Sequence, residues 1–221
     1  MSANIRRSLH PIIAARRSET GLWLKSYPSP RPGLICAKLE PVNTAITLLF
    51  VALASFALRD TKGVVHHEDE WSKSSAVVVF FTTTDCPVSN SYVPEMNRIR
   101  ADYAGRNIAF YAVQTDTTIP ETEVRKHAAE FGFTFPVLLD PKQSLVRLAG
   151  ATATPEAAVL SREGKVLYLG RIDNRVADFD KRRPAPTESD LRDALDAVLA
   201  GKPVAHPTTN VIGCGITLVN R

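Results

Sequence analysis

The chain has 221 residues, 44% of them hydrophobic, which is enough to bury one good core and favours a single domain with accessory segments. Its formal net charge is +4, yet residues 1–43 alone hold seven Lys and Arg side chains against two Glu, so the remainder is close to neutral. Because the other basic residues are scattered among acidic ones, they form no stripe that would attract nucleic acid, and we exclude nucleic acid as a partner.

Residues 44–58 are predicted to be a signal peptide or an anchor. The fourteen residues from Ala45 to Leu58 carry no charge. That run is short for a membrane span, which needs about 20 residues, but it fits the apolar region of a secretory signal that follows a basic segment. Ala52 and Ala54, or Ser55 and Ala57, provide two candidate cleavage sites. A buried helix of the domain is the alternative.

Export to the periplasm or another extracytoplasmic space follows from this reading, and only an uncleaved segment from Ala45 to Leu58 would hold the protein in a membrane. The leader ahead of it, residues 1–43, contains several prolines and no hydrophobic periodicity, which predicts disorder. Residues 59–75 read as a polar linker. Its adjacent His66 and His67 are more often solvated than metal-bound on such a segment, so no metal site is predicted.

A domain over residues 76–200 follows, in which strands and helices alternate. Its first element, AVVVFF at 76–81, is typical of a strand buried on both faces of a sheet. The predicted order is α/β, with a central mixed sheet flanked by helices. The later elements are a helix over 88–103 kinked or restarted at Pro94, a strand over 108–113, a helix over 120–131, a strand over 136–139, a short helix over 142–148, a hairpin of 157–160 with 166–169, a loop over 178–186, and a last helix capped by Thr187.

Cys86 is the strongest nucleophile candidate in the chain. It lies in TTTDCPVSN, where the buried strand gives way to a helix. Unpaired N–H groups and the helix dipole stabilise a thiolate at such a place and lower the cysteine pKa from about 8.5 toward 7. The carboxylate of Asp85 would oppose this unless it caps the helix. Of the other cysteines, Cys36 precedes the apolar segment and would be lost on cleavage, which leaves Cys214 as the second thiol.

Three stretches, FFTTTDCPVSNSYVPEM, TPEAAVL and VLYLGRIDN, resemble the thioredoxin superfamily and within it the AhpC/TSA-type redoxins, over about residues 70–200. The resemblance implies a thioredoxin-like fold in which Pro155 is a cis-proline facing the active cysteine. Two departures stand out. Ser89 occupies the position of the second cysteine of thioredoxins, and of the peroxiredoxin motif only Thr83 is matched, since Val79 stands where that motif has proline.

Cys214 lies in NVIGCGI, within the tail of residues 201–221. The resemblance implies that such a tail cysteine resolves the active one or forms a disulfide with it, and the flanking glycines are expected to leave its backbone free to move. The alternative is a small buried hydrophobe in a terminal strand. Arg171, in GRIDN, matches an arginine that would stabilise the thiolate of Cys86 or polarise a peroxide; a solvated strand-end arginine is the alternative.

These features predict a thiol–disulfide oxidoreductase that uses Cys86 as nucleophile on protein thiols or disulfides. One alternative is an antioxidant thiol peroxidase that attacks hydroperoxide. Another is a binding module that has kept the fold and lost the chemistry. No cofactor is expected, and a copper carrier is disfavoured because Ser89 and Asn90, not a second thiolate, follow Cys86.

Overall fold

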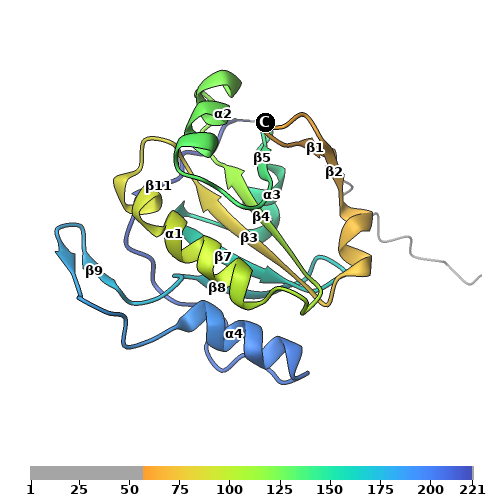
Figure 1. Ribbon diagram of the computed structural model, residues 1–221, viewed down its shortest axis with the longest axis vertical. Coiled ribbons are helices and arrows are strands. Elements are labelled where there is room, and N and C mark those ends of the chain that lie inside the picture. Colours follow the sequence, from red (N-terminus) through yellow and green to blue (C-terminus); the bar gives the residue numbers. More distant parts are fainter. Residues whose placement is uncertain (1–56, 221) are drawn as a thin grey trace, which may run out of the picture. The chain divides into compact units, whose positions relative to one another are not determined.

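A five-stranded sheet forms the centre of the protein in the computed structural model, which describes residues 57–220 (Figure 1). The strand order is β5-β4-β3-β7-β8. β3 pairs in parallel with β4 and antiparallel with β7, so the predicted mixed sheet is confirmed. The strands are β3 (Ala76–Thr82), β4 (Ile108–Gln114), β5 (Val137–Leu139), β7 (Glu156–Leu160) and β8 (Val166–Gly170).

β3 is the central strand because its side chains are apolar on both faces. Every residue of the strand is buried. Val78 and Phe80 belong to one hydrophobic core, while Val77, Val79 and Phe81 belong to a second core on the opposite face. This alternation is what a strand requires when both faces of the sheet are covered.

Helices cover the two faces unequally. α1 (Pro87–Asp102), α2 (Glu121–Glu130) and α4 (Asp190–Leu199) contribute buried residues to the first core, and α3 (Ser144–Ala149) contributes to the second (Figure 1). Of the two outcomes expected at Pro94, a kink or a restart, the restart does not occur, because α1 continues through Pro94 as one helix. The α/β class with helices on both sides of a mixed sheet is therefore confirmed.

Residues 59–75 are part of the domain, and the expectation of a polar linker is wrong. β1 (Ala57–Arg59) pairs antiparallel with β2 (Val65–His67), and the 3-10 helix η1 (Glu68–Lys73) follows. Leu58 and Trp71 are buried in the second core, where each contributes roughly 2 kcal/mol of stability. His66 is not solvated: its ring nitrogens lie 3.3 Å from Asp60 and 3.1 Å from Glu70.

The predicted signal or anchor segment overlaps this first strand. Ala57 and Leu58, its last two residues, belong to β1. The rest of the segment, the leader and Cys36 lie outside the described residues. Within residues 57–220, no helix is long and apolar enough to cross a bilayer.

Two local predictions near α4 are wrong. The charged stretch expected to be a loop contains a small hairpin of β9 (Val176–Asp178) and β10 (Lys181–Arg182). The N-cap of α4 is Ser189, not Thr187. The buried side chain of Asn174 explains the shift, because its amide donates to the Thr187 hydroxyl and its carbonyl accepts the Thr187 N–H, both at 2.8 Å.

The tail returns across the domain and is bound to it at three places. Along β8, the Leu169 N–H donates to Pro207 at 2.9 Å. Next, β11 (Cys214–Gly215) pairs antiparallel with β6 (Ala153–Thr154). Finally, the fully buried amide of Gln143 donates to the Thr217 carbonyl and accepts the Val219 N–H, both at 2.8 Å. The tail is thus a docked element of the domain.

Gly213 is required for this docking. A Cβ atom at this position would lie 2.0 Å from the carbonyl oxygen of Thr154, whereas one at Gly215 would meet nothing within 4 Å. The glycine before Cys214 is therefore explained by close approach of two backbones, not by the expected freedom of movement.

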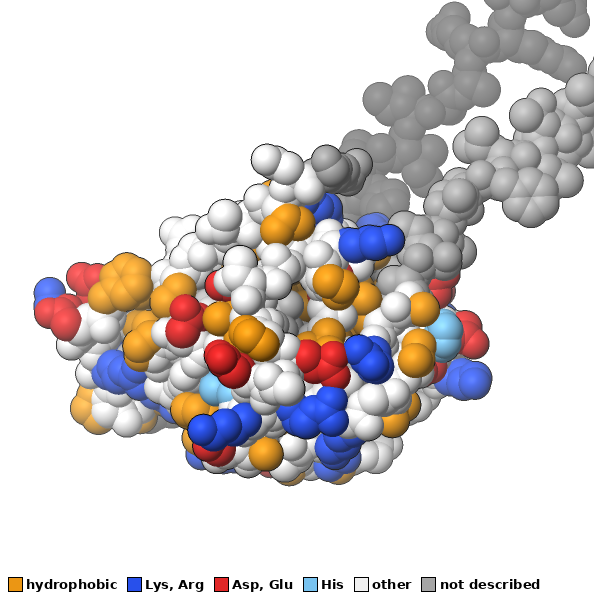
Figure 2. Space-filling model, turned by 90° about the horizontal axis from the view of Figure 1, so that it is seen from above, with side chains coloured by type: hydrophobic (Ala, Val, Ile, Leu, Met, Phe, Trp, Pro, Cys, Tyr) orange, Lys and Arg blue, Asp and Glu red, His pale blue; other side chains and the backbone are white. Residues whose placement is uncertain are grey.

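On the face that Figure 2 shows, basic and acidic side chains are interspersed, and the hydrophobic ones lie in small groups between them. This face carries no broad apolar or basic area. The exposed large hydrophobic residues of the described chain are Val64, Val65, Phe131, Phe179 and Leu218.

We expect Gly213→Ala to weaken the docking of the tail and to lower the free energy of unfolding by about 1–3 kcal/mol, because the new methyl group has no space beside Thr154. Urea unfolding measures the loss, and limited proteolysis detects release of the tail. Gly215→Ala is the matched control and should behave as the wild type. Equal stability and equal proteolysis of both variants would contradict this account.

Candidate active site

Cys86 forms the N-cap of α1 and is buried, with 1% of its surface exposed. β3 ends at Thr82, and the chain turns so that the sulfur of Cys86 accepts the N–H of Ser89 at 3.4 Å. Pro87 fills the first helical position, where the missing N–H costs nothing. The sulfur therefore lies at the positive end of the helix dipole, as predicted.

A loop 68 positions further along the chain faces this sulfur. The Thr154–Pro155 peptide bond is cis, as the resemblance implied. The Cys86 thiol, when protonated, donates to the carbonyl oxygen of Thr154 at 3.3 Å. Cys86 and the cis-proline loop thus meet across the end of the sheet.

The tail adds Cys214 to the same place. Cys214 is the register partner of Thr154 in the β11–β6 pair. Since the carbonyl oxygen of Thr154 lies 3.3 Å from the sulfur of Cys86, this pairing brings Cys214 close enough to lower the pKa of Cys86. The two cysteines are free thiols in this structure, and Cys214 is only half-buried. The fold has therefore brought a cysteine 128 residues beyond Cys86 to the loop that faces it.

The two thiols have opposite pKa shifts. Burial raises the pKa of Cys86, but hydrogen bonds from Cys214, from the Thr154 side chain and from the Ser89 N–H outweigh burial, and the net effect is a pKa below the ordinary value. Burial, the hydrogen bond to Cys86 and the negative charges of Cys86 and Asp85 raise the pKa of Cys214 to about 12. When the pair loses a proton, Cys86 therefore loses it before Cys214 does.

Thr83 lies next to the site but its hydroxyl is not directed at the sulfur. It donates to the carboxylate of Asp85 at 2.8 Å and accepts the amide of Gln114 at 3.4 Å. Asp85 is exposed and does not cap α1, since Cys86 itself is the N-cap. Thr83 is thus adjacent to Cys86 without acting on its sulfur.

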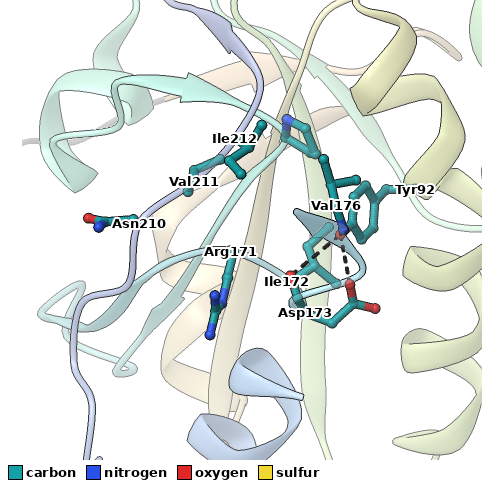
Figure 3. Close-up of a pocket in the computed structure, with 9 residues that line it drawn as sticks. Tyr92, Arg171, Ile172, Asp173, Val176, Asn210, Val211 and Ile212 are labelled. Atoms are coloured by element: carbon teal, nitrogen blue, oxygen red, sulfur yellow. Dashed lines mark hydrogen bonds between the residues drawn. The ribbon is translucent and has the colours of Figure 1, made fainter. Parts of the chain in front are cut away.

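Arg171 is an ion-pair residue in this structure. Its guanidinium binds both carboxylate oxygens of Asp190, at 2.7 and 3.1 Å, and also contacts Glu188. It shares a small cavity of about 30 Å³ with Pro155 and Tyr92 (Figure 3). The predicted contact between the guanidinium and the sulfur is not formed, because the carboxylates at the start of α4 hold it; neither is Arg171 simply solvated.

Several residues that shape the site were not identified from sequence. Tyr92, predicted only as part of an apolar helix face, donates its hydroxyl to Asp173 at 2.7 Å (Figure 3), and burial raises its pKa further above the ordinary value. Arg175 lies over the Tyr92 ring at 5.7 Å and pairs with Asp173 at 3.1 Å. These contacts hold the segment after β8 against α1. The sequence offered one indication of them, the acidic residue Asp173 in the motif GRIDN.

Gln143 was missed for a different reason. Its amide also donates to the Thr115 carbonyl at 2.9 Å, so one side chain joins the end of β4 to the tail. A buried glutamine surrounded by backbone partners leaves no pattern in a single sequence. Within residues 57–220, no group of three side chains is arranged to hold a metal ion.

A cysteine that caps the helix after the central strand, opposite a cis-proline loop, defines a thioredoxin-like redox protein. A model of the Redoxin family matches residues 51–183, and the chain belongs to this family.

Known relatives agree with this assignment. The chain is 27% identical, over 111 residues, to the thiol-disulfide oxidoreductase ResA of Geobacillus thermodenitrificans; the match covers 50% of this chain and 62% of that protein. A hypothetical protein of Sinorhizobium meliloti is 29% identical with a TM-score of 0.65, over 76% of this chain and 93% of that one. A candidate thiol:disulfide interchange protein DsbE of Chlorobium tepidum is 26% identical with a TM-score of 0.52, over 66% and 94%.

We expect Cys214→Ala to raise the pKa of Cys86, because a thiol that donates to the sulfur is removed. The thiolate fraction at pH 7 should fall by about three- to tenfold. Following thiolate absorbance against pH, in a Cys36→Ser background, measures this change. Cys214→Ser keeps a donor and should retain most of the shift, so identical titrations of the Ala and Ser variants would contradict a donor role.

Proposed function

We propose that this protein is a thiol–disulfide oxidoreductase in which Cys86 and Cys214 form one dithiol/disulfide pair. One observation carries the proposal: Cys214 is the register partner of Thr154, whose carbonyl oxygen lies 3.3 Å from the sulfur of Cys86, so the tail brings a second thiol beside the first. A thiolate beside a protonated thiol has both the nucleophile and the resolving group of disulfide exchange. The name of the ResA relative supports the same activity.

The exchange follows from the chemistry of the pair. The Cys86 thiolate attacks one sulfur of a partner's disulfide, which forms a mixed disulfide and releases one partner thiolate. Cys214 then loses its proton and attacks the sulfur of Cys86, which closes the Cys86–Cys214 bond and releases the second partner thiolate. Two electrons pass from the protein to the partner, and the proton of Cys214 goes to a leaving thiolate. Protein thiols and disulfides are the proposed substrates.

Peroxidase activity has weaker support from the site. The Thr83 hydroxyl is occupied by Asp85, and the Arg171 guanidinium by Asp190 and Glu188. Arg171 is the group that the resemblance would have directed at a peroxide, and Thr83 is the one matched residue of the peroxiredoxin motif. A binding module without catalytic activity is also disfavoured, since binding alone requires neither the lowered pKa of Cys86 nor a second thiol beside it.

We expect mild oxidation to join Cys86 and Cys214, in a Cys36→Ser background, with loss of two hydrogens by mass spectrometry and reversal by dithiothreitol. Reduction of insulin disulfides should be lost in Cys86→Ser, because the thiolate is absent, and should stall at a mixed disulfide in Cys214→Ser. Asp180→Asn, at an exposed position in the β9–β10 turn, is the control for unchanged activity.

Either of two results would contradict the proposal. One is the absence of any Cys86–Cys214 bond under oxidising conditions. The other is rapid consumption of hydroperoxide that stops after one turnover in Cys214→Ser, which would indicate a peroxidase instead.

We also propose that the domain works outside the cytoplasm, after removal of the basic leader and most of the apolar segment. A compartment in which disulfides persist suits a two-cysteine site. Of the two candidate cleavage sites, the one after Ala54 leaves β1 complete, whereas cleavage after Ala57 would remove the residue that pairs with His67.

We therefore expect the mature protein to begin at Ser55. Mass spectrometry of protein purified from the cell envelope or the periplasm measures its amino terminus. Ala54→Arg should block this processing, since a large charged residue replaces the small one before the cut, while Arg59→Lys is a control beyond the cut. A terminus at Leu58, or unprocessed protein in the cytoplasm, would contradict the expectation.

A further inference from the structure

The two sulfurs of the pair differ in their access to solvent. Cys86 is 1% exposed, beneath the tail and the cis-proline loop, whereas Cys214 is half-buried. A cavity of about 350 Å³ reaches Cys214 and is not lined by Cys86. An external thiol can therefore approach Cys214 without displacing the tail.

The cavity beside Cys214 has an acidic, hydroxyl-rich wall. Asp85 and Asp116 line it, together with five threonines, and no Lys or Arg does. The Asp116 carboxylate is held by the backbone N–H and the hydroxyl of Thr118, at 2.8 and 2.7 Å, which fixes its position. An incoming thiolate that bears additional negative charge is repelled there, and one that bears a positive charge is attracted.

Resting on the proposed function, we infer that the disulfide of the oxidised pair is reduced by attack on Cys214. An external thiol carrying a nearby positive charge enters the cavity lined by Asp85 and Asp116 and attacks the sulfur of Cys214. The bond between the two cysteines breaks, Cys86 leaves as thiolate, and a mixed disulfide forms on Cys214. A second external thiolate then attacks the external sulfur of that mixed disulfide. It releases an external disulfide, and Cys214 regains a proton. Two electrons have entered the protein.

The leaving group supports this direction. Attack on Cys214 expels Cys86, whose thiolate is stabilised by the Ser89 N–H and the start of α1. Attack on Cys86 would expel Cys214, which lies at a half-exposed tail position near Asp85 and lacks a helix terminus. In disulfide exchange the more stable thiolate leaves faster. Access and leaving-group stability thus select the same sulfur.

The test maps the mixed disulfide on the oxidised wild-type domain in a Cys36→Ser background. Cysteamine is added, free thiols are trapped at once with N-ethylmaleimide, and the peptides are analysed by mass spectrometry. We expect cysteamine on Cys214 and the maleimide on Cys86. The reverse pattern would overturn this inference while leaving the Cys86–Cys214 exchange intact, whereas failure to form that disulfide at all would overturn the proposed function itself.

The charge preference is tested by rate. Cysteamine should reduce the oxidised protein faster than mercaptoethanesulfonate when the two are compared at equal thiolate concentration, and Asp116→Asn should lower this preference by about two- to fivefold. The asparagine retains an oxygen for Thr118, and Asp180→Asn is the matched control. Short peptides with cysteine between two lysines or between two glutamates test whether thiols of peptides show the same charge preference in the rate of reduction. An unchanged preference in Asp116→Asn would overturn the assigned role of the cavity.

Discussion

Three segments far apart in the sequence meet at the sulfur of Cys86, and the organisation of the site depends on that meeting. The first turn of α1 contributes the Ser89 N–H, the cis-proline loop contributes the side chain of Thr154, and the tail contributes Cys214. Each donor partly offsets the cost of placing a thiolate in a buried position. Without the distant segments, only the first turn of α1 would oppose the rise that burial causes in the pKa of Cys86.

The tail can make its contribution only because the domain is built to receive it. Gly170 and Gly213 have no side chain, which leaves room for Thr209 beside Gly170 and for Thr154 beside Gly213. Gln143 binds the tail beyond Cys214. The position of Cys214 is therefore set by backbone contacts on both sides of it. A cysteine held in this way remains beside its partner in the reduced state, when no covalent bond joins them.

Sequence reasoning succeeded where the signal was local. The run AVVVFF predicted the central strand, and the step from that strand into a helix placed Cys86 at the helix start, where the structure has it. The same reasoning failed where a distant partner decides. Arg171 is held by Asp190, and Thr187 by Asn174. The spacing of these residues in the sequence indicates neither pairing. The proximity of Cys86 and Cys214 rested on resemblance alone, since nothing in the residues themselves indicated how the tail would return.

The segment before the core shows another limit of composition. HHEDE reads as solvated, yet Trp71 follows it and is buried, and Tyr111 on β4 donates to Glu70 at 3.0 Å. One large apolar side chain outweighs several charged neighbours, because it buries far more surface than they must desolvate. A short polar segment that contains a tryptophan is better predicted as packed than as a linker.

Placing the second sulfur on the tail rather than on α1 changes what the redox state can control. A second cysteine at the Ser89 position would close a loop within one helix turn and constrain little else. Closure between Cys86 and Cys214 instead spans most of the domain, and in the chain-entropy view a loop of about 100 residues restricts the unfolded chain by about 4–5 kcal/mol. The oxidised pair would thus bind the tail covalently over the cis-proline loop, while the reduced pair leaves it held by hydrogen bonds and close packing. Such a disulfide would couple the redox state of the pair to the docking of the whole tail, because the serine at position 89 leaves no second thiol within the first turn of α1.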